Sequence, residues 1–309
     1  LAGKGATPPH VLVMTATPIP RTVAMTVFGD LDVSTLTELP AGRAEITTHV
    51  VPAGEKPHYL ERGWQRVREE VAAGHQAYVV CPRIGGAQGT DDLEPVEPPT
   101  EDEARRPALA VLELAPTLVT GPLAGLRVEV LHGRLPADAK DDVMRRFTAG
   151  EVDVLVATTV IEVGVDVPNA TVMVVMDADR FGVSQLHQLR GRVGRGSAPG
   201  LCLLVTEVPA ASAAGERLAA VAATLDGFAL SRIDLEQRRE GDVLGASQSG
   251  RQTSLRMLSV LRDEQVIADA REEATALVAE DPDLSAHPAL RAAVAAWVDE
   301  ERADYLEKA

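Results

Sequence analysis

The sequence predicts an α/β protein, with a parallel sheet that carries helices on both faces, followed by a mainly helical C-terminal region. Two observations support this fold class. Between about residue 11 and residue 207, short runs that are apolar throughout alternate with amphipathic stretches of helical period. Such runs are typical of strands buried on both faces, and their alternation with helices indicates a parallel sheet. After Pro209 the sequence becomes Ala-rich, with helical periodicity.

Each element follows from its local pattern. Strands are expected at 11–14, 46–51, 77–81, 127–131, 154–157, 172–176 and 201–205. Helices are expected between them at 56–73, 104–120, 136–149 and 183–190. Two further helical stretches, at about 211–226 and 254–279, flank a loop at 241–252 that contains Gly and Ser.

These patterns divide the chain into three parts. Residues 1–44 end in the string TELPAGR at 37–43, which places a Pro and a Gly between two periodic segments, as a linker does. Residues 45–207 form the α/β domain, interrupted at about 84–107 by a Gly-, Pro- and acid-rich insertion that we expect to be a solvated loop. Residues 208–309 form the helical region. Because the first residue is Leu1, in mid-pattern, we expect the sequence to be a fragment.

Composition allows a globular protein of two domains, since the chain has 309 residues. The net charge of -16 argues, taken alone, against a nucleic-acid partner. The charges are segregated, however, because residues 91–103 hold seven acids and no base, and residues 180–195 hold four arginines and no acid. The distribution of charge therefore decides, not its sum.

Two cysteines, Cys81 and Cys202, lie in apolar runs. We expect them to be core thiols of a protein from a reducing compartment, not a disulfide or a metal site. No apolar run approaches the length that spans a membrane, and no signal peptide is visible.

The sharpest functional signal is the string QLHQLRGRVGRG at 185–196. Arg192 and Arg195 are each preceded by a glycine, and they follow a helix-like stretch that contains Gln188. A planar donor that is always charged can stabilise a phosphoryl group in the transition state of its transfer. Glycine lets the backbone approach closely. A solvated basic turn explains the bare pattern equally well, so its context has to decide.

The string ATTVIEVGVDVPNA at 157–170 joins a buried strand to Thr158 and Thr159, which Gly164 and Asp166 follow. In open parallel sheets, ligands bind beyond the carboxyl ends of the strands. Hydroxyls there can hold a backbone phosphate, and an aspartate can accept a hydrogen bond from a ribose hydroxyl. A strand that ends in a turn with an aspartate cap would give the same string without any ligand.

Two further strings place polar groups after strands. In VLVMTATPIPR at 11–21, a strand leads to Thr15 and Thr17 before two prolines stop any immediate helix. In LHGRLPADAKDDVMRRF at 131–147, a strand ends at His132 and Gly133, and the helix after it can offer N–H groups to a phosphate. An ordinary strand exit explains the first string as well. His132 lacks the paired carboxylate or nucleophile that would accompany a general base.

In their order along the chain, these strings resemble the signature motifs of superfamily-two helicases. TATPIPRT is similar to motif III, AYVVCPRI to motif IV, ATTVIEVGVDVPNA to motif V and QLHQLRGRVGRG to motif VI. Within that superfamily the chain resembles the RecG family of branched-DNA translocases, through DLDVSTLTELPAGR, LHGRL, the long motif VI and DGFALSRIDLEQRREGDVLGASQSG at 226–250. The last string resembles the translocation motif that RecG shares with the transcription-repair coupling factor. The ELPAGR linker and the short tail favour RecG.

The resemblance implies two RecA-like lobes with ATP bound between them. It implies an ATP-dependent DNA helicase that remodels stalled replication forks and Holliday junctions in DNA recombination and repair. The expected partners are branched DNA and ATP, with no membrane, for a monomer in the bacterial cytoplasm that associates with the nucleoid. The implied roles are catalysis for Arg192 and Arg195, ATP binding for Gln188, Gly164 and Asp166, DNA binding for Thr158, Thr159, His132 and Gly133, and coupling for Thr15, Thr17 and Gln248.

The sequence departs from the family pattern in two ways. It contains no GxxxxGK[ST] string and no acidic DExH box. We therefore expect the phosphate-binding loop and the ligands of Mg²⁺ upstream of Leu1, and we expect this chain alone to be inactive.

Two alternatives remain open from the sequence. One is a translocase like the transcription-repair coupling factor. The other is a nucleic-acid-binding module without enzymatic activity, for which the sequence offers only two local basic clusters, at 190–195 and 238–251. An α/β hydrolase or a dehydrogenase ranks far lower, because neither a G-x-S-x-G elbow nor a G-x-G-x-x-G string after the first strand is present.

Overall fold

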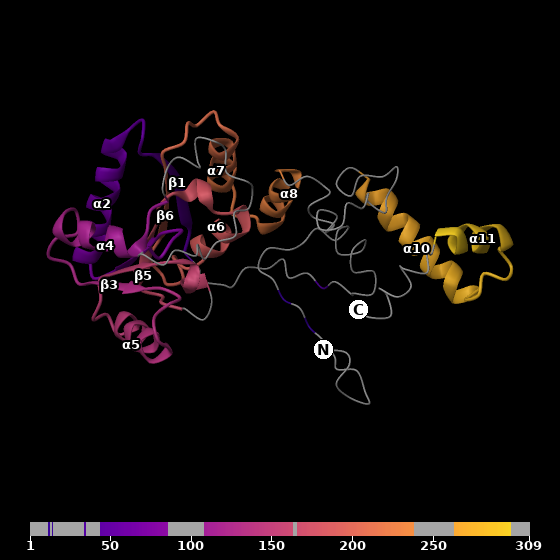
Figure 1. The fold of residues 1–309 in the computed structure, drawn as a ribbon, viewed down its shortest axis with the longest axis horizontal. Coiled ribbons are helices and arrows are strands. Elements are labelled where there is room, and N and C mark those ends of the chain that lie inside the picture. Colours follow the sequence, from indigo (N-terminus) through magenta and orange to yellow (C-terminus); the bar gives the residue numbers. More distant parts are fainter. Residues whose placement is uncertain are drawn as a thin grey trace. The chain divides into compact units, whose positions relative to one another are not determined.

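The structure is a computed structural model that describes residues 44–85, 108–162, 166–237 and 263–297, together with Leu12, Met14 and Ser34. The chain divides into two compact units (Figure 1). Most of the described residues belong to the unit that spans Ser34–Arg238, which we call the sheet unit. Residues 263–297 belong to the other, which we call the helical unit.

The sheet unit is built on six parallel strands. In chain order they are β1 (Ile46–Pro52), β2 (Gln76–Val80), β3 (Val128–Leu131), β4 (Val154–Ala157), β5 (Ala170–Val175) and β6 (Gly200–Thr206). Their order across the sheet is β1-β6-β5-β2-β4-β3, and every neighbouring pair runs parallel. The α/β fold with a parallel sheet is thus confirmed, and six of the expected strands lie where the sequence predicts them.

Alternate strand residues contribute to two apolar cores, one on each face of the sheet (Figure 1). On one face, Tyr78 and Val80 belong to a core with α5 (Ala137–Thr148), α6 (Val183–Arg190), α7 (Ala213–Ala223) and α8 (Gly227–Gln237). On the other face, Ala77 and Val79 pack with α2 (Pro57–Ala72) and α4 (Val111–Thr120). Strands β2, β4 and β5 are buried at every residue, which explains why their sequences are almost wholly apolar.

Both cysteines occupy the core, as predicted. They are free and buried, and burial raises the pKa of each thiol, that of Cys202 to about 12. A thiol that stays protonated at neutral pH is a poor nucleophile and a poor metal ligand. Within the described part of the chain, no helix has the length and the apolar character needed to cross a membrane.

The insertion expected at 84–107 begins later than predicted. Ile84 is only 2 % exposed, and its carbonyl accepts a hydrogen bond from the N–H of Leu112 at 3.0 Å. The carbonyl of Arg83 accepts the N–H of Val111 at 2.9 Å, so the two ends of the insertion are fastened to each other. Helix α4 accordingly begins at Val111 and not at residue 104. Residues 86–107 lie outside the described residues.

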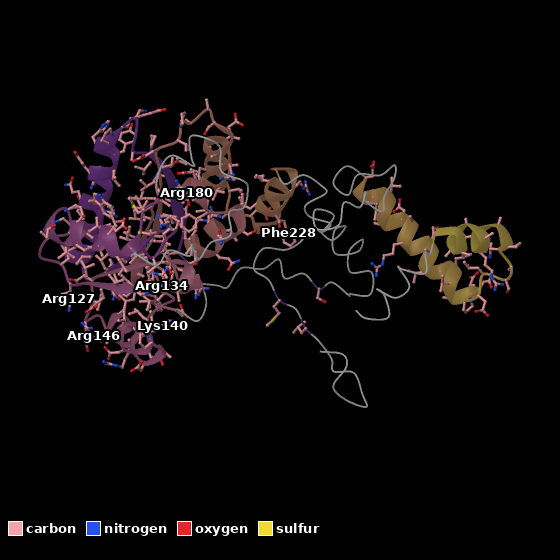
Figure 2. The ribbon with its side chains drawn as sticks, in the orientation of Figure 1. Arg127, Arg134, Lys140, Arg146, Arg180 and Phe228 are labelled. Carbon is pink, nitrogen blue, oxygen red and sulfur yellow. The ribbon has the colours of Figure 1, made fainter. Side chains whose placement is uncertain are left out.

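Helices α7 and α8 pack on the sheet unit, so this unit extends past the boundary expected at residue 207. Leu218 and Val221 of α7 and Leu230 of α8 are fully buried in the core beside α6. Phe228 of α8 keeps 42 % of its surface exposed (Figure 2). The sequence shows that these helices have an apolar face, but helical spacing alone does not say which surface covers it.

The helical unit consists of α10 (Glu264–Glu280) and α11 (Pro288–Trp297). The helix expected at 254–279 is confirmed from residue 264 onward, and residues 254–262 lie outside the described ranges. The turn between α10 and α11 is organised by Asp281, whose carboxylate accepts the N–H groups of Ser285 and Ala286, each at 2.9 Å. Gln248 and the loop at 241–252 are not among the described residues.

The strand expected at 11–14 is not seen at the residues that the structure describes there. Leu12 and Met14 lie outside any strand and are 81 % and 82 % exposed. A strand is stable only when it pairs with a neighbour, and none of the described strands pairs with these residues. Thr15 and Thr17 lie outside the described residues.

Candidate functional site

The arginine-containing string after α6 forms the centre of the candidate site. Helix α6 follows Gly182, whose N–H donates to Oε1 of Gln185 at 3.0 Å, and it ends at Arg190. In the turn beyond, Nε of Arg195 donates to the carbonyl of Gly191 at 2.8 Å. This bond fixes the side chain against its own turn and leaves Nη1 and Nη2 for other partners.

Asp166 is the partner that this guanidinium finds. Nη1 of Arg195 lies 3.1 Å from Oδ1 of Asp166, and the two side chains are 30 % and 68 % exposed. An ion pair this open to solvent contributes on the order of 1 kcal/mol or less to stability. The pair brings together the strings at 157–170 and 185–196, as the sequence predicts for a common site. It is also weak enough to be exchanged for a charged ligand.

Two glycines of the string allow its backbone to pack closely. Gly194 has a φ of +65°, and a Cβ at this position would lie 2.8 Å from Cγ1 of Ile46. A Cβ on Gly196 would lie 2.6 Å from the carbonyl oxygen of Pro168. Both distances are shorter than a van der Waals contact, so these positions exclude any side chain. The glycine spacing therefore holds the arginine turn against β1 and against the residues that follow Asp166.

The Arg195–Asp166 pair lies beside the amino ends of the strands, which corrects the expectation of a site beyond their carboxyl ends. Asp166 precedes β5, and Arg195 precedes β6. Gly194 abuts Ile46 and Gly200, the first residues of β1 and β6. The connection between parallel strands must return from one edge of the sheet to the other, here through the short helix η1 (Thr159–Glu162). The string at 157–170 therefore serves both edges.

Tyr78 of β2 lies on the sheet face beneath this site. Its side chain is fully buried, and its ring centroid lies 5.1 Å from that of Phe147. Burial raises the pKa of its hydroxyl well above the ordinary value, while the positive charges of Arg192 and Arg195 act to lower it. Both arginines therefore lie near one hydroxyl. Among the described residues, that hydroxyl has no hydrogen-bond partner.

The other predicted nucleotide-facing residues are placed in part. Arg192 is half-buried in the turn after α6, and Gln188 is half-buried in the last turn of α6. They share the short segment that also carries Arg195, so all three come from one end of one helix. Gly164 lies outside the described residues.

Arg190 does not belong to an exposed basic cluster. It is 2 % exposed, and Nη1 donates to the carbonyls of Val221 at 2.7 Å and Thr224 at 2.8 Å. Nη2 lies 2.9 Å from Nδ1 of His187. Both carbonyls belong to the end of α7, whose last turn lacks helical partners, so the guanidinium satisfies it. The basic cluster expected at 190–195 is thus reduced to two arginines. Those at 238–251 lie outside the described residues.

The four residues expected to contact DNA gather at the carboxyl edge of the sheet. The ends of β3 and β4 lie side by side, with Leu131 paired to Ala157, so His132 and Thr158 leave neighbouring strands. Thr158 and His132 are buried, at 3 % and 8 % exposed. Thr159 is half-buried and Gly133 is exposed, so these two are the accessible members of the group. DNA contact by all four stays a prediction.

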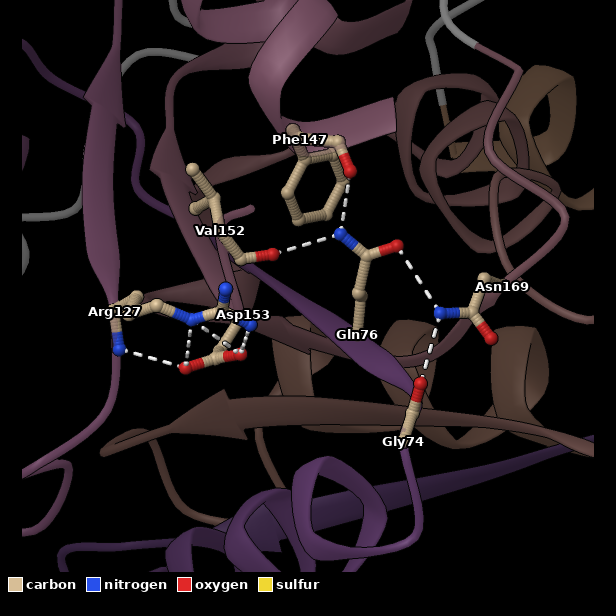
Figure 3. Close-up of polar contacts among 7 residues, drawn as sticks. All are labelled: Gly74, Gln76, Arg127, Phe147, Val152, Asp153 and Asn169. Carbon is tan, nitrogen blue, oxygen red and sulfur yellow. Dashed lines mark hydrogen bonds and ion pairs between the residues drawn. The ribbon is translucent and has the colours of Figure 1, made fainter. Parts of the chain in front are cut away.

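Several polar residues that matter for this arrangement were not predicted. Asp177, after β5, is buried with a φ of 48°, and its Oδ2 accepts the N–H of Leu109 at 2.7 Å. Gln76 at the start of β2 and Asn169 just before β5 form a hydrogen-bond network (Figure 3). The only signal in the sequence is that each is a polar residue at the end of an apolar run.

Two family models match the chain. "Helicase conserved C-terminal domain" matches residues 109–197, which include Asp166 and both arginines of the site. "ATP-dependent DNA helicase RecG, domain 3, C-terminal" matches residues 224–293, which include α8 and α10.

Curated relatives named "ATP-dependent DNA helicase RecG" are similar over most of the chain. The protein of Mycobacterium leprae is 56 % identical over 302 residues, which are 97 % of this chain and 39 % of the relative. The protein of Bacillus subtilis is 44 % identical over 88 % of this chain and 37 % of its own length. The chain thus spans about two fifths of the length of these relatives.

A solved structure supports the same assignment. "Structure of RecG bound to three-way DNA junction" matches with a TM-score of 0.55 and 35 % identity, over 82 % of this chain and 30 % of that chain. The likeness confirms the predicted RecA-like fold class, with a helical region after the parallel sheet.

Proposed function

Since the chain has a RecG-type sequence that matches the C-terminal part of these helicases, we propose that it forms the second motor lobe of an ATP-dependent DNA helicase. The observation that carries this proposal is the meeting of Arg195 with Asp166 at 3.1 Å, with Arg192 beside them above Tyr78. Guanidinium groups on a fixed turn are suited to stabilise the charge that develops on a phosphoryl group during its transfer. Arg192 and Arg195 are the catalytic residues in this proposal.

The remaining nucleotide contacts would be made by Gln188, Asp166 and Gly164. The donors on this chain fit the phosphates and ribose of ATP, because two cations and one carboxylate come from adjoining loops. No group of His, Cys, Asp or Glu that could hold a metal ion occurs within the described ranges. The loop that cradles the phosphates and the ligands of Mg²⁺ would therefore be supplied by a first lobe, across which the arginines reach.

The DNA-binding surface in this proposal is the carboxyl edge of the sheet. Gly133 and Thr159 are its accessible members, and the short distance between β3 and β4 would let them hold one phosphate backbone, with Thr158 and His132 behind them. Thr15 and Thr17 would couple this edge to the nucleotide. Gln248, in the translocation motif, would transmit the cycle to DNA.

We assign the activity to branched DNA, that is, to stalled replication forks and Holliday junctions in recombination and repair. The related RecG structure is bound to a three-way DNA junction, which supports this substrate class. We place the protein in the bacterial cytoplasm as a monomer that associates with the nucleoid. The match of residues 224–293 to a RecG domain favours this function over that of the transcription-repair coupling factor.

The test is the replacement Arg192→Ala in the complete helicase that carries this chain. A group that acts in the transition state contributes to rate more than to binding, so turnover should fall about 10³-fold or more with nucleotide affinity almost unchanged. Arg195→Ala should behave similarly. DNA-stimulated phosphate release and the Kd of a fluorescent ADP are the measurements. ATPase activity near the wild-type level in both variants would show that the arginines are structural.

A further inference from the structure

The loop that carries Asp166 is anchored by a network of side-chain amides at the amino edge of the sheet (Figure 3). Nε2 of Gln76 donates to the carbonyls of Phe147 at 2.6 Å and Val152 at 2.7 Å. Nδ2 of Asn169 donates to Oε1 of Gln76 at 3.2 Å and to the carbonyl of Gly74 at 3.0 Å. Gln76 is 3 % exposed, so its three bonds saturate a buried amide.

The chemistry of the partners fixes how both amides are oriented. The carbonyls of Phe147 and Val152 only accept, so the nitrogen of Gln76 must face them. Its oxygen then faces Asn169, which must present its own nitrogen. Neither amide can be turned over without breaking bonds at both ends. The network therefore has a single arrangement, and Asn169 is the member that belongs to the loop after Asp166.

The same loop is held from its other sides as well. Val167 is 2 % exposed in the core, and its carbonyl accepts the N–H of Ala170 at 3.0 Å. The carbonyl of Asn169 accepts the N–H of Gln76 at 3.1 Å. Pro168 lies against Gly196, at a distance that a Cβ would reduce to 2.6 Å. The residues after Asp166 are thus wedged between β2 and the turn that carries Arg195.

We propose that Asn169 is a positioning residue for Arg195, which it controls by fixing Asp166 through the amide network with Gln76. The proposal rests on the proposed function of Arg195. The Asp166–Arg195 pair is too open to solvent to hold the guanidinium firmly by itself. The place of the carboxylate must then come from the backbone beneath it, which the network fixes. Asn169 touches neither substrate nor Arg195, so its action is indirect.

The test is Asn169→Ala in the complete helicase, compared with the wild type at saturating branched DNA. A displaced guanidinium should lower kcat for ATP hydrolysis about 10-fold or more, with KM for ATP changed less than about twofold. Asn169→Asp keeps the size of the side chain but turns an oxygen toward Gly74 O and Gln76 Oε1, so it should lower kcat at least as much. Circular dichroism at the assay temperature establishes that each variant is folded.

The matched control is Arg68→Ala. Arg68 Nη1 donates to the carbonyls of Pro122 at 3.2 Å and Ala124 at 2.9 Å, so this variant also loses two side-chain bonds that hold a loop. It lies on α2, which packs on the opposite face of the sheet from Arg195. Its kcat should equal that of the wild type, because fastening a loop does not by itself affect turnover.

A double-mutant cycle separates positioning from general loosening. If Asn169 acts through Asp166, the variant that combines Asn169→Ala with Asp166→Ala should have the kcat of Asp166→Ala alone. An Asn169→Ala variant with wild-type kcat, or effects that multiply in the double variant, would overturn the proposal. Arg195→Ala is measured beside them. If its ATPase rate is unchanged, the proposed function fails; if its rate falls while the cycle is additive, only the role of Asn169 fails.

Discussion

Arg190→Met should destabilise the sheet unit strongly, although arginine is usually a surface residue. The change removes two charge-assisted bonds, to the carbonyls of Val221 and Thr224 at 2.7 and 2.8 Å. Each such bond contributes about 1.5–3 kcal/mol. Relief from burying a charge offsets part of the loss, which leaves a net decrease of about 3 kcal/mol in the free energy of unfolding. For a domain of this size, about 2–4 °C per kcal/mol converts this to a Tm lowered by about 6–12 °C.

The assay is thermal unfolding of the 309-residue chain, followed by circular dichroism. Arg195→Met is the matched control, because Arg195 is 30 % exposed and its ion pair with Asp166 contributes about 1 kcal/mol at most. Its Tm should fall by less than about 4 °C. Equal shifts in the two variants would refute the view that Arg190 is a structural residue inside the protein. So would an unchanged Tm in Arg190→Met together with weaker DNA binding.

Three further outcomes are expected. The 309-residue chain alone should hydrolyse no ATP, because it lacks a phosphate-cradling loop; DNA-stimulated phosphate release above that of its Arg192→Ala variant would contradict this. In the complete helicase, Gln248→Ala should keep most ATPase activity and lose fork unwinding, since an amide can exchange partners between states; a proportional loss of both rates, or no change in either, would argue against coupling. The hydrogen bond with His287, helped by the N–H groups of Ala286 and Ser285, lowers the pKa of Asp281 to about 2. Its stabilising effect is then complete above about pH 4 and lost as the pH falls through about 2, so Asp281→Ala should lower the helix signal at pH 6 but not near pH 2.

The sheet could be predicted because its strands are buried on both faces. Val79 and Tyr78 face different cores, yet both are apolar or aromatic, so the run reads as a strand without knowledge of its partners. The limits of the domain could not be predicted in the same way. Ile84 is one apolar residue beside glycines, and only its bond to Leu112 shows that it belongs to the fold.

The candidate site was predicted in its charged members and missed in its neutral ones. Arg195 and Asp166 were expected to share a site because each stands in a recognisable string, and they meet at 3.1 Å. Arg190 stands in the same string but lies inside the protein, since sequence does not show which way a side chain points. Gln76 and Asn169 were missed because an amide gives no pattern until its partners, far apart in sequence, are known.

The contrast between the charged pair and the neutral network has a physical reason. An arginine that must pass from Asp166 to a phosphate has to be held weakly, because every kcal/mol of the resting ion pair is lost again when the phosphate replaces it. The same arginine has to start from a fixed place, because a shift of about 1 Å in a reacting group can lower a rate about 10²-fold. One interaction cannot be both weak and rigid. An exposed pair that exchanges easily, mounted on a loop whose buried amide bonds do not exchange, meets both requirements.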